Sequence, residues 1–215
     1  MLEKINWLGH SSFRITHNLI IYVDPWKLNE NVKADIILIT HSHFDHMSIS
    51  DINNLIKEKT TLVAPESAKS ELSEVNCEKI FMNPNETKIV KEINISTIPA
   101  YNKNKDYHPK TKKWLGYVIE IDGEKLYFAG DTDYIPEMKK LEDIDIAFLP
   151  ISGKYTMNVN EAVNAALDIQ PKYAIPTHYG DIIGDSNDAK EFIRLLREKD
   201  PTIETLELEK ETEIF

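Results

Sequence analysis

The segment LITHSHFDHMS, residues 38–48, guides the interpretation of the whole chain. It places His41, His43, Asp45 and His46 within six positions, directly after the apolar run ADIILIT, which is typical of a strand buried on both faces. In an extended chain residues i and i+2 point the same way, so His41 and His43 can bind one ion. Asp45 and His46 lie where the chain turns and can serve a second ion. Imidazole and carboxylate ligands suit zinc, and also manganese or iron(II).

Two more residues that can bind metal follow strand-like runs later in the chain. Asp131 comes directly after LYFAG, and His178 comes directly after AIPT. Open sheets place their ligand sites outside the carboxyl ends of their strands. The sequence therefore predicts that Asp131 and His178 can converge with His41.

The order of expected elements is similar in both halves of the chain. Each half begins with strands and continues with strand–helix units, and no linker rich in Gly, Ser or Pro separates them. We therefore predict an α/β fold in one domain, residues 1–215, with two mixed sheets packed face to face and helices outside. The expected strands are 4–9, 12–16, 19–24, 34–40, 60–65, 78–83, 87–92, 94–100, a hairpin within 114–132, 144–151, 172–178 and 204–209, and the expected helices are 48–59, 66–75, 158–170 and 186–200.

Composition narrows the class of protein. The chain has 215 residues, of which 41% are hydrophobic, as in ordinary globular proteins. No apolar run approaches the length of a membrane span, and the first residues carry charge where a signal peptide is apolar, so we expect a cytoplasmic protein without a membrane partner. Cys77 is the only cysteine, which excludes an internal disulfide and a thiolate metal cluster. The formal net charge of -11 disfavours nucleic acid as a partner.

One segment departs from this acidity. Residues 101–114, the lysine-rich segment YNKNKDYHPKTKKW, contain five lysines and one histidine. A charge run of this kind is either a solvated loop or part of a site that meets an anionic substrate, such as a phosphorylated or carboxylated small molecule. The sequence leaves open whether the chain acts alone or as a homo-oligomer.

The motif THSHFDH resembles the signature of the metallo-β-lactamase superfamily. Further matches follow in the expected order: VDP with Asp24, AGDT with Asp131, and PTHYG with His178. The stretches WLGHSSF, AFLPISGKYTM and IPTHYG are similar to the small metal-dependent hydrolases of that superfamily, a branch that includes the L-ascorbate-6-phosphate lactonase. The resemblance implies a four-layer αββα sandwich, in agreement with the element order.

The resemblance also implies roles for these residues. His41 and His43 would hold a first metal ion, while Asp45, His46 and His178 would hold a second and Asp131 would bridge both. A hydroxide between the two divalent ions, most simply zinc, would be the nucleophile, because a divalent ion lowers the pKa of bound water from about 15.7 to about 7. Asp45 thereby takes part in catalysis as well as in binding metal.

Three other residues are placed near the metals by the same resemblance or by their neighbours. His10 is expected beside the ions, as a substrate contact or as a partner of a ligand. Asp24 is expected to accept a hydrogen bond from a ligating histidine. Tyr179 can donate a hydrogen bond to a developing oxyanion, although a packing role fits equally well.

A third histidine for the first ion is missing from its usual place. Members of the superfamily supply it just after a strand in mid-chain, where this sequence has Tyr101 and Asn102. His108 is the only histidine between residue 46 and Asp131. Either the lysine-rich segment folds His108 back onto the metal, which we favour, or the first site is open and weaker.

These features predict a metal-dependent, dinuclear hydrolase that acts on a small ester or lactone. The same ligands would also serve a phosphodiesterase or nuclease, which the acidity of the chain and the lack of a long RNA-clamping insertion disfavour. A metal-stabilised binding module without turnover is a third alternative. Redox chemistry at a di-iron centre is a fourth, and no flavin-binding domain accompanies the chain.

Overall fold

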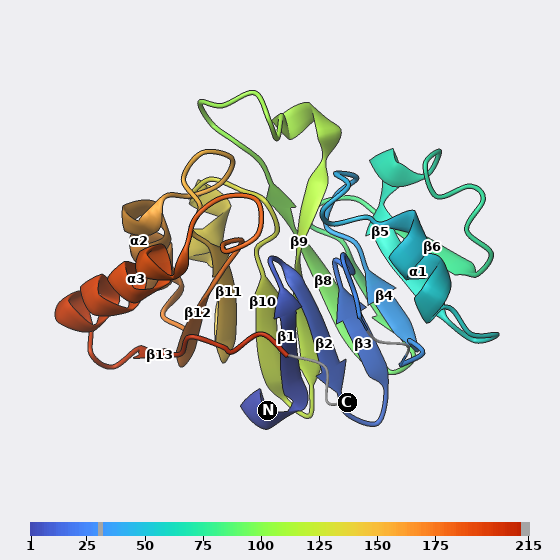
Figure 1. Cartoon of the computed structure of the whole chain (residues 1–215), viewed down its shortest axis with the longest axis horizontal. Helices are drawn as coiled ribbons and strands as arrows, with labels where there is room; N and C mark the ends of the chain where they lie inside the picture. Colours follow the sequence, from blue (N-terminus) through green and yellow to red (C-terminus); the bar gives the residue numbers. More distant parts are fainter. Residues whose placement is uncertain (30–31, 212–215) are drawn as a thin grey trace.

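The computed structural model describes residues 1–29 and 32–211. It contains two mixed sheets packed face to face, and the chain passes from the first sheet to the second through the short connection between Met82 and Thr87 (Figure 1). The first sheet has the order β1-β2-β3-β4-β5-β6 and the second has the order β13-β12-β11-β10-β9-β8-β7. In each sheet, antiparallel pairs at one end give way to parallel pairs at the other. The predicted mixed sheets are confirmed.

The bounds of the elements follow the expected ones closely. The strands are β1 Ile5–Gly9, β2 Ser12–Thr16, β3 Ile20–Val23, β4 Ile36–Leu38, β5 Thr61–Pro65, β6 Glu78–Met82, β7 Thr87–Val90, β8 Ile93–Ala100, β9 Trp114–Ile121, β10 Glu124–Phe128, β11 Ile146–Pro150, β12 Tyr173–Thr177 and β13 Glu204–Thr205. The helices are α1 Ile49–Leu55, α2 Val159–Ile169 and α3 Ser186–Lys199, with short 3₁₀ turns at Leu2–Lys4, Glu66–Ala68, Lys110–Lys112 and Pro136–Lys140.

Strand β4 shows how the sequence builds the layers. Its side chains alternate between the two faces of the first sheet, as the period of two in a strand requires. Ile36 and Leu38 enter the cluster of apolar side chains between the two sheets, whereas Ile37 and Ile39 enter the cluster under α1. A strand buried on both faces needs this unbroken apolar run, and the result is the αββα order of layers that the sequence predicts.

The outer helices are fixed by their own ends and by their apolar faces. Asn158 caps α2 and Asp185 caps α3, each through a reciprocal capping box. Helix α2 packs Ala162, Val163 and Ala166 into the cluster that covers the outer face of the second sheet. Figure 1 shows α2 and α3 beside that sheet and α1 beside the first. Among the described residues, no helix combines the length and the apolar character needed to cross a membrane.

Three expected elements are clearly shorter than predicted. The helix expected over residues 48–59 ends at Leu55, because the backbone of Ile56 is already extended. Residues 66–75 form a 3₁₀ turn over Glu66–Ala68 followed by further turns and not a short α-helix, because their backbone bonds are mostly three residues apart. The expected strand 204–209 is reduced to Glu204–Thr205, since it pairs with β12 only through Tyr173 and Ala174.

Candidate metal centre

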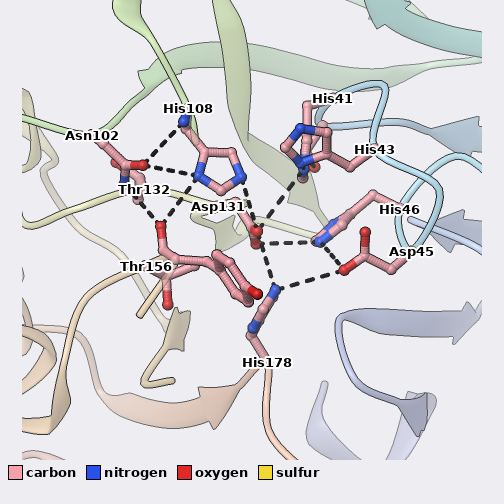
Figure 2. Close-up of polar contacts among 12 residues, drawn as sticks. His41, His43, Asp45, His46, Asn102, His108, Asp131, Thr132, Thr156 and His178 are labelled. Atoms are coloured by element: carbon pink, nitrogen blue, oxygen red, sulfur yellow. Dashed lines mark hydrogen bonds and ion pairs between the residues drawn. The ribbon is translucent and has the colours of Figure 1, made fainter. Parts of the chain in front are cut away.

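The ends of strands from both sheets meet at one place. His41 follows β4 of the first sheet, while Asp131 follows β10 and His178 follows β12 of the second. His41 Nε2 lies 3.9 Å and His178 Nε2 lies 3.1 Å from Asp131 Oδ2. The convergence predicted from strand ends is therefore present in the structure, and Figure 2 shows these side chains pointing into a common space around Asp131.

The histidines and carboxylates divide into sets whose ligand atoms lie within 4.8 Å of one another. One set comes from the first sheet and the lysine-rich segment, and another joins the two sheets. The sets are His41, His43 and His108; His10, Asp45, His46 and His178; and His41, His46 and Asp131. The structure thus brings together all seven residues that the sequence predicts as metal ligands.

Asp131 occupies the centre of the arrangement. Its Oδ2 lies 3.1 Å from His108 Nε2 and 3.1 Å from His178 Nε2, and its Oδ1 lies 3.3 Å from His46 Nε2. Ligands held about 2.0 Å from a tetrahedral ion are about 3.3 Å apart, which matches these separations. A carboxylate in this position can contact both ligand sets.

The residues present fit a pair of metal ions. The Nε2 atoms of His46, His108 and His178 and the Oδ1 atom of Asp131 are buried, yet none has a hydrogen-bond partner among the described residues. Unpartnered buried nitrogen and oxygen atoms are costly, so a group that accepts their lone pairs is required. Five histidines and two carboxylates make a ligand set suited to zinc.

The pKa values of the buried ionisable groups in the centre also favour a bound cation. Burial lowers the pKa of His46, but the carboxylates of Asp131 and Asp24 outweigh it, so the pKa lies well above its ordinary value. Burial raises the pKa of Asp131, but nearby His178 and His46 outweigh it and hold that pKa well below its ordinary range. Buried carboxylates that stay ionised create a negative potential, which a divalent ion neutralises.

Asp24 and Thr40 fix the orientation of the ligands that follow β4. The Asp24 carboxylate accepts hydrogen bonds from the Thr40 backbone N–H at 2.7 Å and from the Thr40 hydroxyl at 2.6 Å. Its Oδ2 also lies 2.7 Å from His46 Nδ1, which leaves His46 Nε2 to face the centre. The expected supporting role of Asp24 is thus visible in its contacts. The φ angle of Asp24 is 46°, a left-handed conformation that aims the carboxylate back across the strand ends.

His10 approaches the centre from β1. Its Nε2 lies 3.1 Å from Asp45 Oδ2, and burial lowers the pKa of His10 to about 4, so the neutral ring donates this hydrogen bond at neutral pH. Burial would raise the pKa of Asp45, but the hydrogen bond from His10 and the proximity of His46 lower it to about 2. His10 is therefore a partner of a candidate ligand, one of its two predicted roles.

His108 reaches the centre because the lysine-rich segment folds back over the strand ends. Its ring is buried, and its Nδ1 lies 3.1 Å from Asn102 Oδ1 and 3.2 Å from the Tyr155 carbonyl. Asn102 in turn donates to Asp133 Oδ1, which also accepts from Lys105 Nζ at 2.7 Å. The structure thus places His108 beside His41 and His43, and its role as a metal ligand stays a prediction.

Several residues of the centre were not predicted individually from the sequence. Asn102, Asp133 and Lys105 form the buried network that supports His108, and Trp114 packs its ring 4.9 Å from that of His41. Nothing in their local sequence marks them, because each acts through partners that are distant along the chain. Only the position of Asp133, two residues after Asp131, hints at a role.

Tyr179 lies at the edge of the arrangement. Its ring packs against Trp7, with centroids 5.2 Å apart, and belongs to the apolar cluster under α2 and α3. Burial raises the pKa of its hydroxyl to about 12. These contacts fit the packing alternative, and the oxyanion role stays a prediction.

A cavity of about 310 Å³ opens above the candidate ligands. It is lined by His43, Phe44, Asp45, Tyr107, His108, Asp131, Tyr155, His178 and Ile182. Tyr155 is among these residues, whereas its neighbour Lys154 lies outside them, with its Nζ 5.0 Å from the centroid of the Tyr155 ring. A small molecule in this cavity would contact both ligand sets.

Comparison with known proteins agrees with this geometry. Residues 4–178 match the family model described as the beta-lactamase superfamily domain. The chain is 32% identical over 214 residues to a UPF0173 metal-dependent hydrolase of Pyrococcus furiosus, covering 92% of this chain and 94% of the relative. It is 35% identical over 213 residues to one of Thermococcus onnurineus, with coverage of 92% and 94%.

Solved structures point the same way. A proposed metal-dependent hydrolase from Parabacteroides distasonis superposes with a TM-score of 0.82 and 37% identity, covering 95% of this chain and 93% of the other. A metallo hydrolase from Ignicoccus hospitalis shares the fold, with a TM-score of 0.80, 23% identity and coverage of 96% and 94%. The chain therefore belongs to the beta-lactamase superfamily, in the group of the UPF0173 metal-dependent hydrolases.

Proposed function

We propose that this metal-dependent hydrolase uses two divalent ions, held within one domain of residues 1–215, to hydrolyse a small ester or lactone. The observation that carries the proposal is the position of Asp131, whose Oδ2 is 3.1 Å from both His108 Nε2 and His178 Nε2. These two histidines belong to different ligand sets. One carboxylate between two sets is the arrangement that a pair of ions requires.

Each residue would have a defined task. The first ion would be held by His41, His43 and His108, the second by Asp45, His46 and His178, and Asp131 would bridge them. Bound there, zinc, manganese or iron(II) would lower the pKa of a water molecule to about 7 and polarise the substrate oxygen. Asp24 and Thr40 keep the ligating nitrogens aimed at the centre, and His10 holds the Asp45 carboxylate.

The cavity supports a small substrate. Its volume of about 310 Å³ lies at the lower end of the range for small-molecule sites. The net charge of -11 opposes binding of a nucleic-acid strand. Hydrolysis would add one water across the acyl C–O bond, and a lactone would yield a hydroxy acid whose carboxyl group releases a proton.

The test is reconstitution followed by a comparison of substrates. Protein loaded with zinc or manganese should contain about two ions per chain by elemental analysis. It should hydrolyse a simple lactone or ester at least about a hundredfold faster than the His46→Ala variant, because that variant loses a ligand of the second ion. The Ile89→Ala variant, altered at an exposed side chain on β7, is the control and should match the wild type.

Other results would favour the alternatives. Faster cleavage of RNA or of a generic phosphodiester than of every lactone and ester would support a phosphodiesterase. Full metal content with no turnover on any of these substrates would support a binding module. Absence of bound metal after reconstitution would contradict all the enzymatic proposals.

A further inference from the structure

Four apolar or aromatic side chains, here called the apolar wall, line part of the cavity above the candidate metal ligands. Phe44, Tyr107 and Ile182 line it and are 69%, 45% and 40% exposed, and Tyr155 completes the wall. Single exposed apolar residues are ordinary on a protein surface. Three around one cavity, from three separate segments of the chain, form a patch of the kind that marks a binding surface.

The wall is held in place by contacts behind it. The rings of Tyr107 and Tyr155 meet edge to face, with centroids 4.6 Å apart and an interplanar angle of 87°. Phe44 lies 6.0 Å from the Trp26 ring, also edge to face. These contacts pack three of the four side chains against neighbouring rings, and all four still line the cavity. An apolar group that enters the cavity can therefore bury itself against preformed aromatic surface.

The lysines that follow β8 are largely engaged elsewhere. Lys105 binds Asp133 and the Thr156 carbonyl, and Lys110 pairs with Glu137. Lys103 lies 5.6 Å above the Tyr134 ring. No lysine or arginine is among the described residues that line the cavity. Lys154, whose Nζ lies 5.0 Å from the centroid of the Tyr155 ring, is also outside the lining. A substrate anion inside the cavity would therefore meet aromatic and aliphatic surface next to the candidate ligands.

From this geometry we infer the substrate class. We propose that the apolar wall of Phe44, Tyr107, Tyr155 and Ile182 binds an alkyl or aryl group attached to the ester or lactone, so that the natural substrate carries an apolar substituent in place of a phosphate or carboxylate. This inference rests on the proposed hydrolase function and specifies its substrate. The ligand residues at the floor of the cavity would receive the acyl group, and the wall would receive its substituent.

The test uses lactones that differ only in their side chain. γ-Butyrolactone, γ-hexalactone and γ-octalactone carry zero, two and four extra carbons, and 5-oxotetrahydrofuran-2-carboxylate carries an anion on the same ring. Full burial of one methylene group raises affinity about fourfold. On a wall that covers only about half of the group, each added methylene should raise affinity about twofold. We expect kcat/KM, followed by proton release, to rise on the order of tenfold from γ-butyrolactone to γ-octalactone and to be lowest for the carboxylate.

Variants locate the effect on the wall. Ile182→Ala and Phe44→Ala should each lower the ratio of the γ-octalactone to the γ-butyrolactone rate by about threefold, while the exposed control Ile89→Ala keeps the wild-type ratio. A ratio near one in the wild type, or tenfold preference for the carboxylate, would overturn the inference. So would a ratio that neither wall variant changes.

A binding measurement separates this inference from the proposed function. The same lactones are titrated by calorimetry into the His46→Ala protein, in which the second ligand set is incomplete. Affinity that rises with chain length, together with no turnover in the wild type, would retain the wall and refute the hydrolase proposal. Turnover in the wild type without any dependence of rate or affinity on chain length would retain the hydrolase and refute the wall.

Discussion

The side chain of Asn102 allows the sharpest test of how His108 is held. Its Oδ1 accepts from the His108 backbone N–H at 3.0 Å and lies 3.1 Å from His108 Nδ1. Its Nδ2 donates to Asp133 Oδ1 at 3.0 Å and to the Tyr155 carbonyl at 2.9 Å. Asn102→Ala removes all four contacts at once, whereas the hydrogen bond from Asn102 N to the His108 carbonyl remains.

The expected magnitudes follow from those contacts. Each neutral hydrogen bond contributes about 1 kcal/mol, and since part of the network survives we expect a loss of about 2 kcal/mol in the free energy of unfolding. For a chain of this size that corresponds to about 4–8 °C in melting temperature. Loss of a residue that orients a metal ligand lowers metal affinity about 10- to 100-fold. His108 Nδ1 still has the Tyr155 carbonyl as a partner in the variant, so we expect a loss of about tenfold. This loss should affect only the ion that His108 would bind.

The assay is a zinc titration against a chromophoric chelator, together with thermal unfolding with and without zinc. Lys110→Met is the matched control, since it breaks the Lys110–Glu137 ion pair within the same segment without removing any contact of the Asn102 side chain. A lower melting temperature with both zinc affinities unchanged would refute the reasoning and leave Asn102 a purely structural residue. An equal loss at both ions would do the same.

Three further predictions test other parts of the structure. Asp131→Ala should lose metal and activity while keeping the fold, judged by elemental analysis and circular dichroism, and unfolding with wild-type metal content would contradict its assigned role. Gly130→Ala should lose about 2 kcal/mol or more, because φ is 65° and the added Cβ would lie 2.9 Å from the Leu115 carbonyl; a denaturant titration measures this. Asp145→Asn should destabilise the protein at pH 7, and the loss of stability should shrink as the pH falls below the ordinary value of a carboxyl group. Burial raises the pKa of Asp145, but the hydrogen bond from Lys172 outweighs it and the net pKa is lowered, so its stabilisation is present above the ordinary value of about 3.9 and lost as the pH falls through the folded value; a series of unfolding measurements from pH 7 downward measures the difference.

Much of the fold could be predicted from local sequence. The runs that became β4, β5, β11 and β12 are largely apolar because they are buried on both faces, and this pattern needs no knowledge of the rest of the chain. Residues 66–75 show the limit of that approach. Ala68, Leu72 and Val75 have helical spacing, yet their buried side chains are equally well placed by consecutive turns.

Most of the candidate ligands could also be predicted from local sequence. His41, Asp131 and His178 each follow a strand. Residues that follow strands at the same edge of a sheet lie close together, so their proximity could be expected from the sequence. Asn102 and Asp133 were not visible, since their interaction spans 31 residues and depends on how the lysine-rich segment folds back. The same folding pairs Lys105 with Asp133. This lysine therefore supports the protein's own carboxylate, whereas the sequence alone suggested that the lysine-rich segment could meet an anionic substrate.

The residues around Asp131 come from position 10 to position 178, and they lie on both sheets. No early piece of the chain contains a complete set, so metal ions bound as proposed would be captured only after the two sheets have docked. Interactions that form after the rate-limiting step of folding slow unfolding and leave the folding rate nearly unchanged. Bound metals would therefore lower the unfolding rate and prolong the lifetime of the native state, while the folding rate would stay nearly the same.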